Sequence, residues 1–419
     1  MKGDWEQIKL DDWVANGAVE LGRGDIISKD DIAESPGPYP IYSSSAHNNG
    51  KFGEYAKYMF NEELVTWSVD GGGNLFYRPK HKFSVTNVCG YMRVKSELLH
   101  APFVYYCLAD QHNYLTFDYT TKAHPSVIRK LYWLPSIDVS VQKRIVQILQ
   151  ALDQAIEKTE LLIEKYQQIK AGLMHDLFTR GIGPDGKLRP PREQAPELYQ
   201  ETPIGWIPKD WGLPMLGDYA DICSGVTLGS KVAPGQTIKV PYLRVANVQD
   251  GYLDLTEVKE ILVSLKTLEA LRLQSGDVLM NEGGDFDKLG RGTVWQGEIE
   301  PCIHQNHVFR VRVVAGLLRP YFLAYWSQSE FGKKYFVLSS KQSTNLASIN
   351  STQLHKFPVA LPAIEEQEAI ETRIGAVNER IDTLDAERQK LTTQKAGLMH
   401  DLLTGKVQVN ADPPEVARV

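Results

Sequence analysis

The sequence has few cysteines and no long apolar segment. Its four cysteines lie far apart and form no C-x-x-C pair, which argues against a zinc ribbon or a disulfide framework and favours reduced thiols. No apolar run approaches the ~18 residues of a membrane helix, and the N-terminus has no apolar signal segment. We therefore expect a cytoplasmic chain that is neither secreted nor embedded in a membrane.

An excess of positive charge is also missing. The 46 Lys and Arg residues are outnumbered by 52 Asp and Glu residues, so the formal net charge is −6. A nucleic-acid-binding surface, if present, must therefore be local rather than spread over the whole molecule. The length of 419 residues and a hydrophobic content of 42% suit two or three domains, each with its own core.

Motifs for catalysis and metal binding are incomplete. His304 and His307 have no carboxylate or thiolate at ligand spacing, so we predict no metal site. The glycine clusters at 70–73 and 281–284 lack the G-x-G-x-x-G pattern of dinucleotide sites. Gly181–Lys187 has the glycine and lysine spacing of a phosphate loop but lacks the following Ser or Thr. We predict no catalytic residue and no bound cofactor on this chain.

An internal repeat organises the sequence. The eight residues Lys170–Leu177 recur unchanged as Lys395–Leu402, and the same offset relates Gln142 to Gln367. A shorter repeat, the dipeptide Asp-Trp, stands at the start of each variable region, as Asp4-Trp5 and as Asp210-Trp211. The chain therefore alternates two variable regions with two conserved segments.

This pattern predicts a domain organisation with six segments. They are a recognition domain at 1–134, a helical spacer at 135–182, a linker at 183–208, a second recognition domain at 209–361, a second spacer at 362–407 and a tail at 408–419.

Both conserved segments carry apolar residues at alternating spacings of three and four, the pattern of a coiled-coil seam. Two matched helices of one chain most simply pack on each other, and a pseudo-twofold repeat would make them antiparallel. A buried stripe in an ordinary helical domain is the alternative. The residues expected to pack are Ile145, Leu149, Leu152, Ile156, Ile370, Ile374, Val377 and Ile381.

The two variable regions have a mixed pattern of strands and helices. Each shows the order strand, glycine turn, strand, helix, so they are expected to be divergent copies of one fold. The overall fold class is therefore α/β, of the mixed α+β type. The predicted strands are 63–69, 83–88, 277–280 and 308–314, and the predicted helices are 102–108 and 320–326.

The conserved segments resemble those of the specificity subunits of type I restriction-modification enzymes. The second segment carries the resemblance most clearly, with Leu361-Pro-Ala-Ile-Glu-Glu-Gln367 before its helix and Lys395–Leu402 at its end. The first segment departs from this pattern at Asp138–Gln142. The Pro203–Trp211 entry to the second variable region is also similar to the family.

The resemblance implies a division of labour. Each variable region would be a target-recognition domain that reads one half of a bipartite site in double-stranded DNA, with the paired helices setting the gap. The subunit would do no chemistry itself. Two methyltransferase subunits would hold S-adenosylmethionine, and two restriction subunits would use ATP and Mg²⁺. DNA-binding surface would then be shared among subunits, which fits the acidic net charge.

Base-reading residues are expected among polar side chains on loops, which can form paired hydrogen bonds in a groove. Solvated polar loops are the alternative for any one of them. The candidates in the first region are Tyr42, Ser43, Ser44, Ser45, His47, Asn48, Asn74 and Lys122. Those in the second are Arg244, Asn247, Lys341, Gln342, Ser343 and Asn345. The basic cluster Arg78, Lys80, His81 and Lys82 suits phosphate contacts, which position DNA without specifying sequence.

Two other functions remain open from the residues. A stand-alone DNA-modifying enzyme would need its own S-adenosylmethionine pocket, and a coiled-coil scaffold would bind without sequence recognition.

Overall fold

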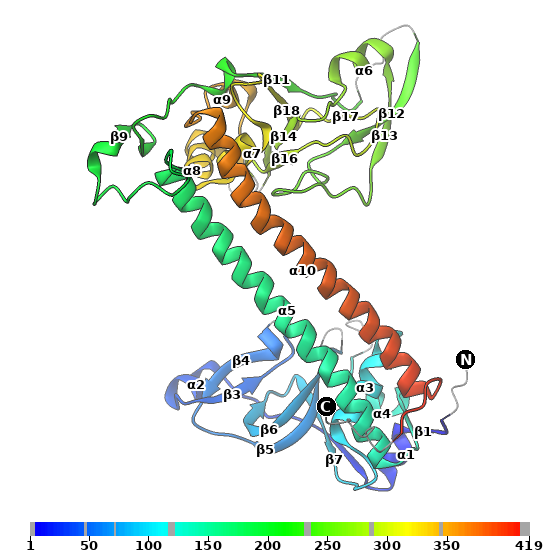
Figure 1. Cartoon of the computed structure of the whole chain (residues 1–419). Helices are drawn as coiled ribbons and strands as arrows, with labels where there is room; N and C mark the ends of the chain where they lie inside the picture. Colours follow the sequence, from blue (N-terminus) through cyan, green and yellow to red (C-terminus); the bar gives the residue numbers. More distant parts are fainter. Residues whose placement is uncertain are drawn as a thin grey trace, which may run out of the picture. The chain divides into compact units, whose positions relative to one another are not determined.

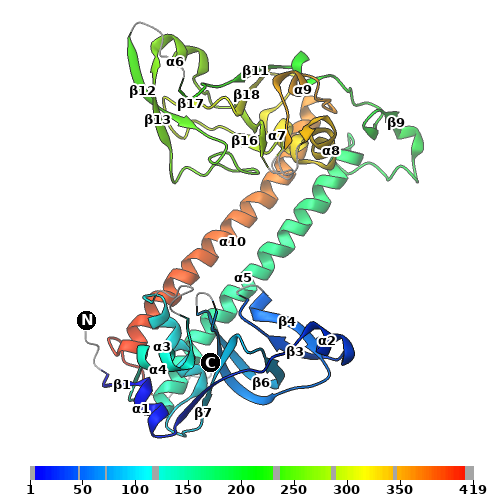
Figure 2. The same ribbon diagram turned by 180° about the vertical axis from the view of Figure 1, so that it is seen from behind.

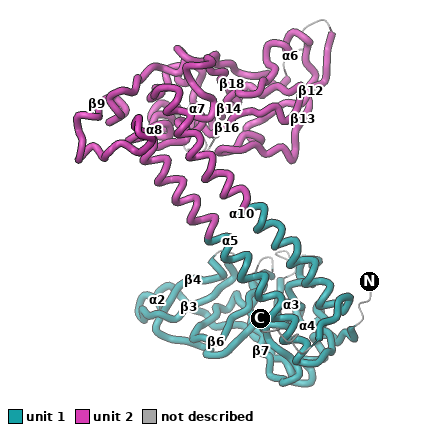
Figure 3. The backbone as a smooth tube through the Cα atoms, viewed as in Figure 1, with its two compact units in different colours: residues 1–161, 384–419 teal, residues 162–383 magenta. Residues whose placement is uncertain are grey.

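A computed structural model describes residues 5–45, 48–70, 73–115, 122–229, 236–284, 289–342 and 347–410. The chain divides into two compact units (Figure 3). Unit 1 contains residues 1–161 and 384–419, and unit 2 contains residues 162–383. Two long helices, α5 (Val139–Arg180) and α10 (Ile364–Thr404), each contribute to both units. Each unit therefore combines one variable region with a part of each long helix.

The elements of unit 1 before α5 follow the expected mixture of strands and short helices. They are β1 (Gln7–Lys9), α1 (Leu10–Ala15), β2 (Val19–Arg23), α2 (Lys29–Glu34), β3 (Tyr39–Tyr42), η1 (Asn48–Gly50), β4 (Lys51–Tyr55), β5 (Phe60–Ser68), β6 (Leu75–Val85), β7 (Cys89–Val94), α3 (Ala101–His112), α4 (Pro125–Leu131) and β8 (Trp133–Pro135). The β3–β4 hairpin and α2 form one end of this unit, and α3, α4 and β1 form the other (Figures 1 and 2).

Unit 2 has a similar composition with shorter strands. Its elements between the long helices are η2 (Pro196–Leu198), β9 (Tyr199–Thr202), β10 (Gly205–Pro208), η3 (Leu216–Asp218), β11 (Ala220–Ser224), β12 (Thr237–Leu243), β13 (Lys259–Ser264), α6 (Leu265–Leu271), β14 (Val278–Asn281), β15 (Gly283–Gly284), β16 (Gly292–Val294), β17 (Ile303–His304), β18 (Val308–Val313), α7 (Pro320–Gln328), α8 (Glu330–Ser339), β19 (Lys341–Gln342), β20 (Ala347–Ser348) and α9 (Ser351–His355).

The main sheets of the two units share one topology. In unit 1 the strand order is β2-β7-β5-β6-β3-β4, with every neighbour antiparallel except β3 and β6. In unit 2, β11-β18-β14-β16 repeats the first four strands. The sheet β17-β12-β13 repeats the rest, with β12 parallel to β17. The expectation that the variable regions are two copies of one fold is confirmed, and the long β6 is represented in unit 2 by the short strands β16 and β17.

A close backbone contact recurs beside the parallel pair of each unit. A Cβ atom on Gly24 would lie 1.9 Å from the carbonyl oxygen of Val85. A Cβ atom on Gly225 would lie 1.9 Å from the carbonyl oxygen of His304. An isolated parallel bridge follows each glycine. Only glycine allows this approach, so both units preserve the same crossing of chain segments.

A helix packs on each main sheet at the place that the sequence predicts. Helices α3 and α7 both carry proline in the first turn, where its missing N–H costs no helical hydrogen bond. Phe103 of α3 and Phe322 of α7 are fully buried in the two main hydrophobic cores. These helices therefore connect each sheet to the long helices, which supply other residues of the same cores.

The repeated glutamine of the first conserved segment holds α5 to the chain before α3. The Gln142 carbonyl oxygen accepts a hydrogen bond from the backbone N–H of His100 at 2.9 Å. Its amide nitrogen donates to the carbonyl groups of Leu98 at 2.8 Å and Ile137 at 2.9 Å. The side chain is fully buried, so it satisfies three backbone groups that are closed off from water.

Gln367 makes the same three bonds in unit 2. It accepts from the N–H of Arg319 at 2.9 Å and donates to the carbonyl groups of Leu317 at 3.1 Å and Pro362 at 3.0 Å. The repeat at this position is therefore structural: each glutamine joins the start of a long helix to the segment leading into α3 or α7.

Within each unit the two long helices run antiparallel, because unit 1 holds the beginning of α5 with the end of α10 and unit 2 holds the reverse. They lie side by side in both views (Figures 1 and 2). In unit 1 the ammonium of Lys395 lies 2.5 Å from the carboxylate of Asp153. In unit 2 the guanidinium of Arg380 lies 5.9 Å from the ring centroid of Tyr166.

The predicted seam residues fall into two groups. Ile145, Leu149, Ile370 and Ile374 are fully buried. Leu152, Ile156, Val377 and Ile381 are half-buried. The buried residues belong to the main cores of the two units, together with strands and helices of the variable regions. These four side chains therefore also hold the long helices to the variable regions, and their packing between the two helices stays a prediction.

Each long helix ends at a glycine that a tryptophan covers. Gly181 and Gly405 have φ of 64° and 80°, as expected for the left-handed residue that ends a helix. A Cβ atom would lie 2.6 Å from the Trp211 ring in the first case and 2.7 Å from the Trp5 ring in the second. This contact accounts for the repeated Asp-Trp pair: Trp211 packs on the end of α5, and Trp5 packs on the end of α10.

The predicted linker at 183–208 has a defined fold in unit 2. Strands β9 and β10 form an antiparallel hairpin, and the Tyr199 hydroxyl donates to the carbonyl of Pro190 at 2.5 Å. Gln200 donates through its side-chain nitrogen to the carbonyl of Trp211 at 2.8 Å. The segment predicted as a linker therefore contains regular structure of its own.

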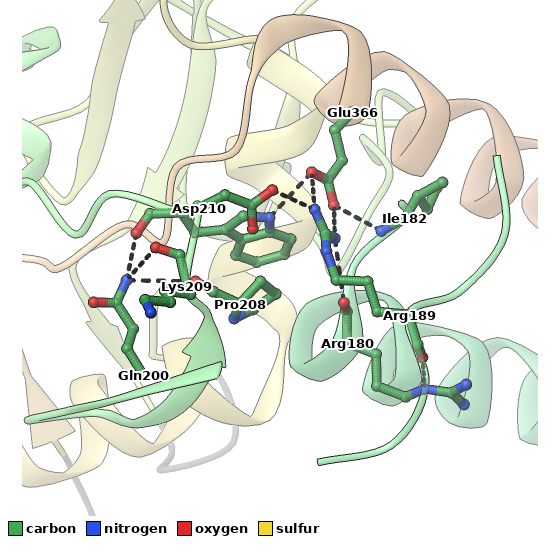
Figure 4. Close-up of polar contacts among 9 residues, drawn as sticks. Arg180, Ile182, Arg189, Gln200, Pro208, Lys209, Asp210 and Glu366 are labelled. Carbon is green, nitrogen blue, oxygen red and sulfur yellow. Dashed lines mark hydrogen bonds and ion pairs between the residues drawn. The ribbon is translucent and has the colours of Figure 1, made fainter. Parts of the chain in front are cut away.

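A buried ion pair attaches this segment to α10. The side chains of Arg189 and Glu366 are 8% and 10% exposed, and they form paired bonds of 2.6 and 3.0 Å (Figure 4). Glu366 also accepts from the backbone N–H of Ile182 at 2.6 Å and the Trp211 indole at 3.1 Å. Glu366 therefore joins the end of α5, the following segment and the start of α10 within unit 2.

Candidate nucleic-acid interface

The predicted base-reading residues of unit 1 lie mainly between β3 and β4. Tyr42 ends β3, and Ser43–Ser45 and Asn48–Gly50 together form what we call the β3–β4 connection. Ser45, Asn48 and Asn49 are exposed. Asn49 was not among the predicted residues, although its type and position match those of its neighbour. His47 lies outside the described residues.

Arg78, predicted to contact phosphate, is buried beneath this connection. It is 1% exposed, and its guanidinium lies 3.6 Å from the ring centroid of Tyr42. It donates to the carbonyl oxygen of Asn49 at 2.8 Å and to the hydroxyl of Thr66 at 3.0 Å. Burial lowers the pKa of Arg78 to about 10. The prediction is wrong for this residue, because its cation supports the protein backbone instead of facing a DNA phosphate.

The rest of the basic cluster has mixed surroundings. Lys80 is exposed. His81 lies with Nε2 3.2 Å from the Tyr42 hydroxyl, and the Lys82 ammonium lies 4.7 Å from the Tyr58 ring centroid. Lys80 therefore remains the candidate in this cluster for a phosphate contact.

Asn74 and Lys122 flank the turn between β5 and β6. The Lys122 ammonium lies 2.8 Å from the carboxylate of Asp70, just after β5. Asn74 is half-buried, and its carbonyl accepts from the N–H of Ser68 at 3.0 Å. Both residues lie near a strand end, where a DNA contact remains a prediction.

In unit 2 the connection between β12 and β13 corresponds to the β3–β4 connection. Asn247 lies in it but is only 3% exposed. Its side chain accepts from the N–H of Arg244 at 3.0 Å and donates to the carbonyls of Asp254 at 2.9 Å and Glu257 at 3.0 Å. Arg244 itself donates to the carbonyl of Glu257 at 3.0 Å. The prediction of base reading is wrong for Asn247, which instead fixes the shape of this connection.

Two of the remaining candidates of unit 2 lie on a small sheet. Lys341 and Gln342 form β19, which pairs with β20, and β20 pairs with β15. Ser343 and Asn345 lie outside the described residues. Their role in DNA binding stays a prediction.

A polar pair of unit 2 has no counterpart among the described residues of unit 1. His307 Nδ1 lies 2.5 Å from the carboxylate of Glu282. The backbone N–H of Glu282 donates to the carbonyl of His307 at 3.0 Å, as Val69 does to Val88 in unit 1 at 2.9 Å. The shared fold thus presents polar side chains in one unit where the other has valine.

His304 and His307 do not face a common site. His304 is fully buried, with Nδ1 2.7 Å from the carbonyl of Val308, and burial lowers its pKa to about 4. In the described part of the chain, no group of three or more His, Cys, Asp or Glu side chains could hold a metal ion. Within the same residues, no helix is long and apolar enough to cross a membrane.

Buried His304 should make unit 2 less stable in acid. Its pKa falls from 6.5 when unfolded to about 4 when folded. The neutral form therefore contributes stability above pH 6.5, and that contribution is lost as the pH falls toward 4. We expect the loss to reach roughly 3 kcal/mol. Urea unfolding of the wild type and of His304→Asn, which retains a donor for Val308, should give diverging profiles over this range. Parallel profiles would contradict the role assigned to His304.

A comparison with protein families identifies the repeat. The family described as "Type I restriction modification DNA specificity domain" matches residues 2–165 and 208–393. The two matches fall on the two variable regions and reach into the conserved helices. The repeated organisation predicted from the sequence is thereby confirmed.

Individual proteins give the same result. The chain is similar to the type I restriction enzyme MjaVIII specificity subunit of Methanocaldococcus jannaschii, with 25% identity covering 97% of this chain and 93% of that protein. A crystal structure of the S subunit of a type I restriction-modification system from M. genitalium matches with a TM-score of 0.59 and 16% identity, covering 96% of each chain. A second structure, from a study of type I system assembly and conformational transition, matches with a TM-score of 0.51 and 13% identity, covering 97% of this chain and 99% of that one. These structures share the fold.

Proposed function

The chain belongs to the specificity subunits of type I restriction-modification enzymes, and we propose that each of its two target-recognition domains reads one half of a bipartite DNA site. The observation that carries this proposal is the duplication of one fold with different surface residues. Two copies of one scaffold reading the two halves separately would produce an asymmetric site.

The long helices are proposed to set the unspecified gap between the half-sites. Support comes from α5 and α10, which are continuous over 42 and 41 residues and antiparallel within each unit. Half-buried seam residues and the Lys395–Asp153 pair are consistent with a coiled-coil spacer. The length of a helical spacer is fixed by its number of residues, at about 1.5 Å per residue.

The chemistry is assigned to partner subunits under this proposal. Two methyltransferase subunits would hold S-adenosylmethionine and modify adenines, while two restriction subunits would use ATP and Mg²⁺ for translocation and cleavage. The specificity subunit would act in the cytoplasm as the non-catalytic part of the complex. Its exposed candidates for DNA contact are Ser45, Asn48, Lys80 and Lys122 in unit 1.

Co-expression tests the proposed function directly. The full chain and its cognate methyltransferase subunit are produced together in a host without DNA methylation, and modified adenines are mapped across the genome. We expect one bipartite motif, methylated only when both proteins are present. Absence of new methylation despite a soluble complex would favour a scaffold, and methylation by the chain alone would favour a stand-alone enzyme.

A further inference from the structure

The β3–β4 connection has an unusual backbone. Asn48 and Asn49 have φ of 50° and 51°, and Gly50 follows with φ of 74°. Among the described residues, these two asparagines are the only non-glycine residues with positive φ. The left-handed conformation is unfavourable for residues with a Cβ atom and concentrates at functional sites, where the surrounding structure stabilises it.

Buried polar groups hold this backbone from below. The N–H of Ser43 donates to the carbonyl of Gly50 at 2.8 Å, and the Ser43 hydroxyl accepts from Thr86 at 2.9 Å. Arg78 donates to the carbonyl of Asn49, and a Cβ atom on Gly50 would lie 3.1 Å from its guanidinium. The guanidinium therefore fills the space under the turn and fixes its height above the sheet.

The cation of Arg78 has no carboxylate among its bonded partners in the described part of the chain. Its partners are the Asn49 carbonyl, the Thr66 hydroxyl and the faces of the Tyr42 and Phe76 rings. Burying a charge without a counterion costs free energy. If the turn only had to close the hairpin, a neutral side chain could fill the same space without that cost. A fixed turn geometry accounts for the use of arginine, because its planar fork bonds and stacks at the same time.

The outer side of the connection has the chemistry of base recognition. Asn48 and Asn49 are exposed, and an asparagine amide can form paired hydrogen bonds with adenine in the major groove. None of the described residues of the connection is acidic. The corresponding connection of unit 2 carries Asp250, Asp254 and Glu257, which would repel DNA phosphates. The inference is therefore confined to unit 1.

We propose that Asn48 and Asn49 read bases of one half-site and that Arg78 is a positioning residue that presents them. This inference rests on the proposed function, because it names the reading element within one target-recognition domain. The other half-site, read by unit 2, then serves as an internal control for folding, assembly and partner binding.

The first test removes the anchor. Arg78→Met keeps an unbranched apolar stem but removes the charge and the fork. Co-expressed with the methyltransferase subunit, it should relax base preference at one or more positions of one half-site by about tenfold, the size of a lost paired base contact. The gap and the other half-site should be unchanged. Arg78→Lys should restore part of the preference, because it returns the charge without the fork.

The second test removes the reading side chains and leaves the backbone. Asn48→Gly with Asn49→Gly favours the observed left-handed conformation, so the turn should keep its shape. The same half-site should lose preference at the affected positions. Asn113→Gly, at an exposed asparagine after α3 in the same unit, is the matched control and should leave the motif intact.

The outcomes separate the inference from the function on which it rests. A relaxed preference in one half-site, with the same positions affected by both tests, supports it. An unchanged motif with the asparagine double variant overturns the base-reading role, and an unchanged motif with Arg78→Met overturns the positioning role. If Arg78→Met abolishes all methylation, the inference is tested by the asparagine double variant and by Arg78→Lys, which should both relax the same half-site. Failure of the wild-type pair to methylate any bipartite site would instead reject the proposed function.

Discussion

Inserting seven residues into both α5 and α10 is expected to lengthen the unspecified gap in the DNA site by about three base pairs. A heptad adds about 10 Å to a helix, and B-form DNA rises about 3.4 Å per base pair. Insertion after Leu161 in α5 and after Thr383 in α10 would place the extra turns between the parts of each helix that belong to the two units. Both half-sites should keep their sequences, because neither target-recognition domain is altered.

Methylation mapping of the co-expressed variant measures the gap. A variant with the heptad in only one helix is the control, because the unmatched residues must displace the seam and methylation should fall sharply. A change in either half-site, or an unchanged gap in the matched variant, would contradict the role of the helices as a spacer.

Replacing Arg189 by methionine is expected to destabilise unit 2 by about 3–5 kcal/mol, the usual effect of removing one partner of a buried ion pair. The substitution leaves the carboxylate of Glu366, only 10% exposed, without its charged partner. The Trp211 and Ile182 donors would remain, but neither carries a charge to balance it. The anchored segment between α5 and β9 should therefore detach from the start of α10.

Urea unfolding of the full chain provides the measurement. Arg192→Met changes the same residue type on the same segment, where the side chain is 42% exposed and its ion pair is 3.7 Å long, so its effect should stay below about 1 kcal/mol. The double variant Arg189→Met with Glu366→Gln should be less destabilised than Arg189→Met alone, because no buried charge is left without a partner. Equal effects of the two arginine substitutions would show that burial of the Arg189–Glu366 pair contributes nothing.

Residue type alone does not distinguish side chains that contact DNA from side chains that stabilise the fold. Arg78 and Asn247 have the residue types of DNA contacts, yet both are buried and bond backbone carbonyls. Their type shows what they can bond, but the partners that they reach depend on the folded path of the chain: Arg78 bonds Asn49 of another segment, and Asn247 bonds Asp254 within its own connection. Asn49 was missed because a left-handed backbone has no signal beyond its residue type, which also suits a solvated loop.

The ion pair of the linker could not be predicted for a related reason. Its prolines are typical of an extended connection, and nothing in the segment itself indicates a buried cation. Arg189 finds its carboxylate on Glu366, far away in sequence, so the pair exists only after the segment has folded onto α10.

The sequence by itself determined the duplication, the family and the two long helices. Repeats and helical periodicity are recorded in the order of residues, and local hydrogen bonding follows that order. Tertiary structure decided which parts meet. The repeated motif ending α5 packs in the core of unit 2, and the one ending α10 packs in the core of unit 1. The end of α5 thus packs with the second variable region, which follows it in the chain, whereas the end of α10 packs with the first variable region, which is remote in sequence. Burial depends on contacts between residues far apart in the chain, and no local pattern specifies them.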